Sequence, residues 1–125
     1  MAPLWEEMST GRKVVEAVGL PILWGVLCGL AAGVSGGLYL VGVIIGILGG
    51  VAGGMQYRDR NSALVRGIVA GTLFGLAILL GIEISGSDPK ADLPDPRILL
   101  LVLTIVPSIP LHWLGWRIRA RQSTA

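Results

Sequence analysis

Four long apolar stretches, separated by short polar segments, dominate the sequence. They run over about 14–35, 38–55, 64–84 and 97–116. Each is close to the roughly 20 residues that an α-helix needs to cross the hydrocarbon core of a bilayer. The pattern therefore predicts an all-α integral membrane protein, in which residues 1–125 form a single domain with four transmembrane helices.

Two boundaries depend on proline and glycine. Pro21 lies inside the first stretch. It predicts either a kinked helix or a short interfacial helix that ends at Leu20, with the span proper starting afterwards. Gly36 and Gly37 separate the first two stretches. Because glycine adopts positive φ at little cost, we expect this pair to form the turn of a tight helical hairpin.

Small residues recur at every fourth position in the first three stretches, which places them in one stripe along a helix. In lipid, such a stripe allows two helix backbones to approach closely. We therefore expect glycine-zipper packing among the first three helices. The fourth stretch lacks the series, so we expect it to be a peripheral or mobile helix. The glycines of the stripes are Gly25, Gly29, Gly33, Gly42, Gly46, Gly50, Gly54, Gly67, Gly71 and Gly75.

The stripes offer more small surface than one hairpin needs, because some glycines are doubled, as at Gly49-Gly50 and Gly53-Gly54. Helices in lipid gain no hydrophobic drive for association, so close van der Waals contact has to supply it. This surplus predicts a homo-oligomer or packing against another membrane subunit.

Composition excludes a soluble domain. Hydrophobic residues make up 53% of the chain and charged residues only 14%, against about 25% charged in soluble domains. The single cysteine, Cys28, excludes an intramolecular disulfide and a cysteine-based zinc site. The opening segment lacks the short apolar core and cleavage site of a signal peptide, so we expect the first stretch to be retained as a span.

Basic residues cluster on one side of the four-span arrangement. They are Arg12, Lys13, Arg58, Arg60, Arg66, Arg117, Arg119 and Arg121. The other side has the glycine turn and a mixed loop that contains Asp88, Lys90, Asp92, Asp95 and Arg97. By the positive-inside rule both tails are expected in the cytoplasm, most simply at a bacterial plasma (inner) membrane.

Two acids lie at or near membrane depth, where an ionisable residue is a functional candidate by default. Glu16 is one helical turn from Arg12, so an interfacial ion pair is the simpler expectation. Glu83 is one turn from the mixed loop and is also expected at the interface. Neither residue is near the midplane, where a proton-coupled carrier would place its acid.

The last stretch carries the remaining candidates. His112, the single histidine, is expected as a polar residue at headgroup level, with pH sensing or gating as the alternative. Pro107 and Pro110 predict a kink or an unwound turn, a possible hinge of the kind that transporters use at binding sites.

No catalytic set, cofactor motif, metal-ligand spacing or nucleic-acid motif is evident, so we expect a non-catalytic protein without a bound metal or cofactor. Two function classes stay open. The first is an accessory or structural membrane protein that self-associates or packs inside a larger complex. The second is an oligomeric channel or transporter for a small solute or ion.

Overall fold

The computed structural model describes residues 4–86, 88–90 and 93–124, so Asp92 of the predicted loop lies outside the described residues. Every regular element in this part of the chain is helical, as predicted. Four helical segments are long and apolar enough to cross a membrane, which confirms the number of candidate spans. These segments are Thr10–Ala32, Gly36–Gly54, Arg60–Ser85 and Arg97–Gln122.

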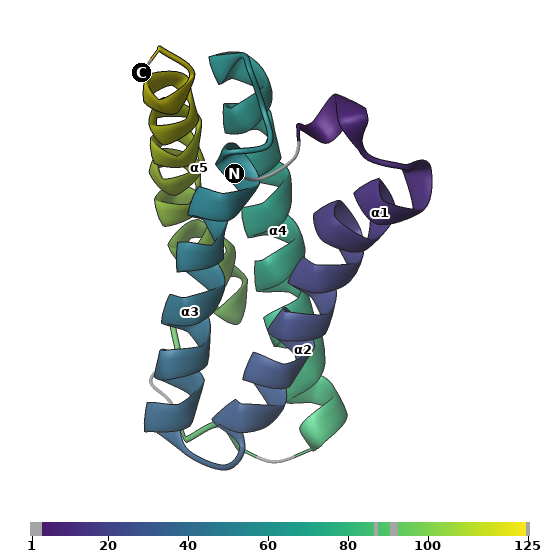
Figure 1. Ribbon diagram of the computed structural model, residues 1–125. Helices are drawn as coiled ribbons and strands as arrows, with labels where there is room; N and C mark the ends of the chain where they lie inside the picture. Colours follow the sequence, from purple (N-terminus) through teal and green to yellow (C-terminus); the bar gives the residue numbers. More distant parts are fainter. Residues whose placement is uncertain (1–3, 87, 91–92, 125) are drawn as a thin grey trace.

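Figure 1 labels five α-helices along this path. A 3-10 turn over Trp5–Glu7 precedes them, and a second one over Arg97–Leu99 leads into the last helix. The α-helices are α1 (Thr10–Val14), α2 (Leu20–Ala32), α3 (Gly36–Gly54), α4 (Arg60–Ser85) and α5 (Leu100–Thr124).

The first span is one continuous helix and not an interfacial helix followed by a separate span. Helix α1 passes into a π-helical segment, Val15–Gly19, and then into α2. In the π segment the N–H of Leu20 donates to the carbonyl of Val15, five residues earlier. Pro21 follows directly, in the first turn of α2. The disturbance expected at Pro21 is therefore a π turn just before it.

The hairpin turn between α2 and α3 differs from the prediction. Gly36 and Gly37 are the first residues of α3 and have no positive φ, so they do not form the turn. Ser35 caps the helix instead, because its side chain accepts a hydrogen bond from the N–H of Leu38 at 3.3 Å. Among the described glycines, positive φ occurs at Gly86, which ends α4.

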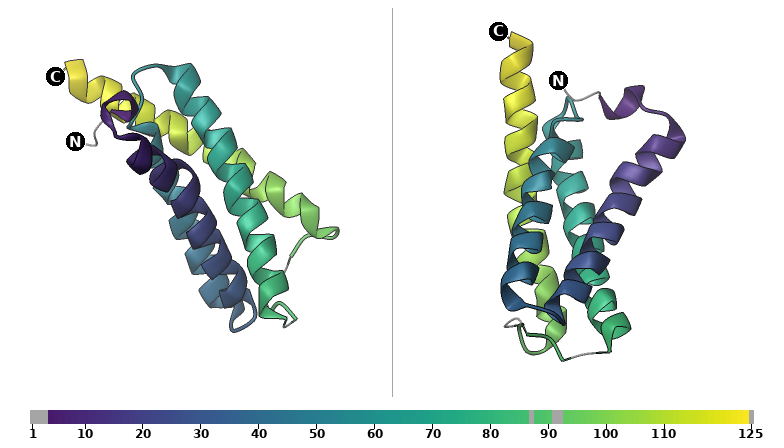
Figure 2. Two further views of the ribbon diagram at one scale, coloured as in Figure 1. Left: turned by 90° about the vertical axis from the view of Figure 1, so that its right-hand side faces the viewer. Right: turned by 60° about the horizontal axis from the view of Figure 1, so that its bottom comes forward.

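Helix α4 occupies the centre of the bundle. Helix α2 packs along one side of it, α5 along another, and α3 lies mainly against α5. In Figure 2, α5 crosses α4 obliquely in the left view and runs alongside α3 in the right view. The side chains of Leu100, Thr104, Ser108 and His112 in α5 are all buried. The expectation that the last span is peripheral was therefore wrong.

Helices α2 and α3 meet at their shared turn and diverge toward the end of the bundle that holds both chain termini, here called the termini end (Figures 1 and 2). Near the closed end of this wedge, the indole N–H of Trp24 donates to the carbonyl of Gly42 at 2.8 Å. The wedge between the two helices is where the candidate site lies.

Candidate functional site

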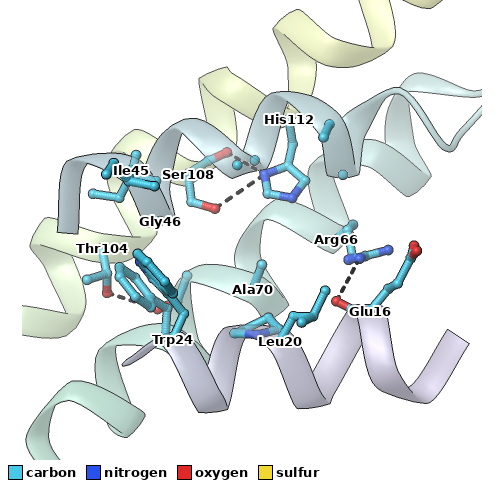
Figure 3. Close-up of a pocket in the computed structure, with 18 of the residues that line it drawn as sticks. Glu16, Leu20, Trp24, Ile45, Gly46, Arg66, Ala70, Thr104, Ser108 and His112 are labelled. Carbon is cyan, nitrogen blue, oxygen red and sulfur yellow. Dashed lines mark hydrogen bonds between the residues drawn. The ribbon is translucent and has the colours of Figure 1, made fainter. Parts of the chain in front are cut away.

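A cavity of about 420 Å³ lies between α2, α3, α4 and α5. Its walls are mostly apolar and include Leu20, Trp24, Ala70 and Phe74. Figure 3 shows polar side chains converging on it from different helices, with Arg66 and Glu16 near one end and Thr104 near the other. A volume of this size, with few polar groups among apolar walls, is typical of small-molecule sites.

The mouth of the cavity lies between α2 and α3. The lining residues Leu20 and Leu23 of α2 are 52% and 58% exposed, and Ile45 of α3 is 53% exposed. All three belong to helices that qualify as membrane spans. The cavity therefore opens sideways, toward the space that acyl chains fill around a membrane protein.

Arg66 is the most unusual lining residue, because its guanidinium is buried with only 8% of the residue exposed. Its Nη1 donates to Oε1 of Gln56 at 2.9 Å and to the hydroxyl of Tyr57 at 3.1 Å. Its Nη2 donates to the main-chain carbonyl of Glu16 at 3.2 Å. Its Nε is buried and has no hydrogen-bond partner in the described chain. Arg66 belongs to neither of the ion pairs found there, Arg12–Glu16 and Arg58–Glu6.

The sequence explains why the carbonyl of Glu16 is available to Arg66. In the π register the next main-chain bond would join the nitrogen of Pro21 to this carbonyl. Proline has no N–H, so it cannot make that bond. A carbonyl left open inside a membrane protein has to find a donor elsewhere. Arg66, from α4, supplies one.

The carboxylate of Glu16 is occupied by other partners. Arg12 donates to Oε1 at 3.1 Å, which confirms the expected ion pair. The side-chain amide of Gln56 donates to Oε2. Gln56 thus bridges Glu16 and Arg66, although its sequence context indicated only a loop residue.

The N-terminal segment covers the guanidinium at the termini end. The ring of Trp5 stacks on that of Tyr57 with centroids 5.8 Å apart, and Arg66 Cζ lies 5.0 Å from the centroid of Trp5. The N–H of Trp5 holds the segment in place by donating to the carbonyl of Gln56 at 2.6 Å. Two aromatic faces on a cation stabilise it without neutralising its charge.

His112 lies inside the bundle with 2% of its surface exposed, so the expected headgroup-level position was wrong. Its Nδ1 is 2.8 Å from the carbonyl oxygen of Ser108. A Cβ added to Gly50 or Gly53 would come within 2.9 or 2.8 Å of the imidazole. The bare backbone of α3 therefore leaves the space that the ring fills.

The hydroxyls of α5 bind α4. Thr104 Oγ1 donates to the carbonyl of Gly71 at 2.9 Å, and Ser108 Oγ donates to that of Gly67 at 2.8 Å. Helix α5 is uninterrupted from Leu100 to Thr124, so the unwound turn suggested by Pro107 and Pro110 is not found.

The remaining glycines of α4 and α2 face neighbouring helices at short range. A Cβ on Gly71 would be 2.6 Å from Ile105 Cα, and one on Gly25 would be 2.6 Å from Ala77 Cβ. Gly67 and Gly75 also face α5, and Gly29 faces α4. The stripe of the third span was expected to face the first hairpin, but α5 covers it.

The other candidates are scattered. A Cβ on Gly46 would be 2.7 Å from Trp24 Cδ1, and one on Gly42 would be 3.0 Å from Cys28 Sγ. Gly54 packs on the carbonyl of His112, and Gly33 ends α2. Glu83 is exposed at the far end of α4 and does not line the cavity.

No group of three or more potential metal-ligating side chains occurs in the part of the chain that the structure describes. Comparisons with protein-family models, curated proteins and solved structures find no match to this chain. Support for a function therefore comes from the cavity and the residues around it.

Proposed function

We propose that this is a non-catalytic membrane protein that binds a small solute inside its helix bundle, as a carrier or transporter does. One observation carries the proposal: the cavity of about 420 Å³ is lined by a buried arginine that has an unpartnered donor. A bundle built only for packing would fill this space with side chains, because protein interiors are close-packed.

The fold also supports a site that opens by movement of α2 against α3. These two helices diverge at the termini end, and the cavity lies between them and the α4–α5 pair. Helix α4 packs extensively on both α2 and α5, so these three helices provide a stable wall on which α3 is the more loosely packed element. A solute could therefore enter or leave while one wall stays in place.

Thermal unfolding of the purified protein in the presence of a small-molecule library tests the proposal. A ligand at a hundredfold excess over its Kd stabilises the folded state by about 2.7 kcal/mol. Ala70→Leu, which adds bulk at the cavity wall, should abolish that shift. Val69→Leu, on the neighbouring exposed position, should retain it. Binding that survives Ala70→Leu would contradict the proposal, and liposome flux assays separate a carrier from a binding protein.

We further propose that both termini lie in the cytoplasm, at a bacterial plasma membrane. Both termini and the α3–α4 connection lie at the same end of the bundle (Figure 1), and the basic residues concentrate in these segments. With Cys28 replaced by Ala, a cysteine introduced at Arg60 should be protected from an impermeant thiol reagent in intact cells and labelled in inverted vesicles. A cysteine at Asp88 should show the reverse pattern.

Self-association through the exposed face of α3 beside the cavity is a second candidate, in which the glycine zipper acts between copies of the chain. Gly49 and Ala52 of this face also line the cavity, so such a contact would cover part of its opening. Gly49 favours self-association, because a Cβ there would meet nothing within 4 Å in the same chain. The exposed neighbours Leu48 and Ala52 extend this face. In a Cys28→Ala background, oxidation should cross-link a cysteine at Gly49 into dimers. A cysteine at exposed Leu76 of α4 should stay monomeric, and equal cross-linking at both positions would contradict this candidate.

A further inference from the structure

We infer that the ligand of the cavity is an amphipathic anion, whose carboxylate or phosphate head binds Arg66 and whose apolar tail lies toward Trp24 and Phe74. This inference rests on the proposed function, because it requires that the cavity bind a small molecule. It adds the chemical class of that molecule and the direction in which it lies.

The first step concerns the charge of Arg66. All three groups to which its guanidinium donates are neutral: the side chains of Gln56 and Tyr57 and a main-chain carbonyl. A buried cation is stable when an anion compensates it, and ionisable groups at membrane depth are paired in most proteins. In the described chain, no carboxylate forms an ion pair with Arg66. An anionic ligand would provide the missing partner.

The neighbouring charged groups do not remove this excess. The Glu16 carboxylate is shared between Arg12 and the amide of Gln56, so its charge is already compensated. Lys13 adds another positive charge, with Nζ 5.6 Å from the centroid of Trp5. The termini end of the cavity is therefore positive, which favours an anion there.

The second step concerns the donor that is free. Nη1 donates both of its N–H groups to the protein and Nη2 donates one of its two, while Nε is buried without any partner. An unsatisfied buried donor is costly, and native structures rarely retain one without a reason. Hydrogen bonds between guanidinium groups and carboxylate or phosphate oxygens are short and strong. An oxygen of such a head group beside the guanidinium would compensate the charge, and a small movement of the Arg66 side chain would bring Nε within its reach.

The third step concerns the apolar part of the ligand. Beyond Arg66 the walls are mainly apolar and include Leu20, Trp24 and Phe74, and the mouth lies between two spans. Thr104, Ser108 and His112 of α5 add a polar strip to one wall. A small hydrated anion would lose its water among mainly apolar walls and gain few polar contacts in return. An acyl chain suits them, and it can enter sideways from one leaflet with its head at the termini end. The same geometry accepts a fatty acid or a single-chain phospholipid.

Displacement of cis-parinarate, a fluorescent fatty acid, from the purified protein in phosphatidylcholine nanodiscs tests this inference. Decanoate and decanol have the same chain and differ in the charged head. We expect decanoate to displace the fluorophore at concentrations at least roughly tenfold lower than decanol does, since one charge-assisted hydrogen bond is worth about that factor. Lysophosphatidate and dodecyl phosphate extend the series to phosphate head groups. Their affinities relative to decanoate show whether the site prefers a fatty acid or a phosphate-bearing lipid.

Three variants locate the site. Arg66→Gln should remove the preference for decanoate over decanol, a loss of roughly ten- to hundredfold in decanoate affinity. Ala70→Leu should weaken both ligands, because it occupies the tail region. Arg60→Gln removes an exposed charge of the same helix that does not line the cavity, and it should change neither affinity.

Each contrary outcome has a definite meaning. If Arg66→Gln does not fold, the ratio of the decanoate and decanol affinities of the native protein still tests whether the ligand is an anion. If the native protein binds both compounds equally well and Ala70→Leu abolishes this binding, the ligand is not selected for its negative charge. That result would contradict the anionic ligand but would still support a small-solute site. If free phosphate or acetate displaces the fluorophore as effectively as decanoate does, the ligand needs no apolar tail, which would contradict the amphipathic part of the inference. Failure of every compound to bind would overturn this inference, whereas the library screen with Ala70→Leu decides the proposed function separately.

Discussion

Nη2 of Arg66 donates a hydrogen bond to the main-chain carbonyl of Glu16 at 3.2 Å, joining the second turn of α4 to the π segment of the first span. Pro21 cannot serve this carbonyl, because it has no N–H. A single proline thus creates an acceptor in one helix, and an arginine in another helix uses it. The pair secures α4 to the first span beside the opening of the cavity.

Replacing Arg66 should destabilise the protein even without ligand. Arg66→Gln leaves acceptors on Gln56, Tyr57 and Glu16 with fewer donors in a buried region. We expect a loss of about 2–4 kcal/mol of unfolding free energy. The measurement is reversible unfolding of the purified protein in mixed micelles. Arg60→Gln, at an exposed position of the same helix, should stay within about 0.5 kcal/mol of the native protein. Equal stabilities of the two variants would show that Arg66 is not a structural tie.

Two glycines of α3 should respond oppositely to alanine. At Gly54 a Cβ would run into the carbonyl of His112, whereas at Gly49 it would meet nothing within 4 Å. Gly54→Ala should therefore cost about 1–3 kcal/mol, as overpacking usually does. Gly49→Ala should be neutral, or stabilising by up to about 1 kcal/mol, because alanine restricts the unfolded chain. Similar unfolding midpoints for the two variants would contradict the close packing of α3 on α5.

The hydroxyl of Thr104 should contribute to the attachment of α5 to α4. Thr104→Val keeps the shape of the side chain and removes the donor to the Gly71 carbonyl. Hydrogen bonds between membrane helices are worth about 0.6 kcal/mol on average, and we expect a loss of that order. Thr72→Val is the matched control, because Thr72 donates to Ile68 of its own helix. A larger loss in the control would contradict this assignment.

The N-cap of α4 should make stability depend on pH. The N–H and hydroxyl of Ser62 both donate to Asp59, and these hydrogen bonds lower the pKa of its carboxyl group below the ordinary value of 3.8. Because the pKa is lower in the folded state, the stabilising contribution is present above pH 3.8 and is lost as pH falls toward the folded pKa.

Asp59→Asn provides the comparison for this effect, since asparagine caps a helix without titrating in this range. Thermal unfolding of both proteins should be followed from pH 6 down to about pH 3. The native protein should lose stability relative to the variant at the acid end of this range. A constant difference between the two across the whole range would contradict the role assigned to Asp59.

The membrane spans and the Arg12–Glu16 pair could be predicted from the sequence, because they depend on local composition and spacing. A long apolar run specifies a span wherever its neighbours lie. Residues four apart on a helix meet for the same local reason. These features required no knowledge of how the helices are arranged.

The cavity and the role of α5 could not be predicted, because both depend on contacts between distant segments. A glycine stripe shows where a neighbour can approach, but it does not identify the neighbour. His112 illustrates this: its burial follows from glycines of α3 that are far from it in the sequence. Arg66 looked like one of several topology signals, and its partners Gln56 and Glu16 are brought together only by folding. An arginine within an apolar stretch, together with a proline five residues after Glu16, was the available signal.

The contact between α5 and the glycines of α3 and α4 bears on how the protein is made. A ribosome delivers the spans in order, so α3 and α4 enter the membrane before the residues that will cover their glycine faces exist. Those faces must remain against lipid, or against an insertion factor, until His112 and Ile105 arrive. Assembly is therefore completed by the last segment synthesised, and a chain that stops before residue 97 should be cleared by quality-control proteases rather than accumulate.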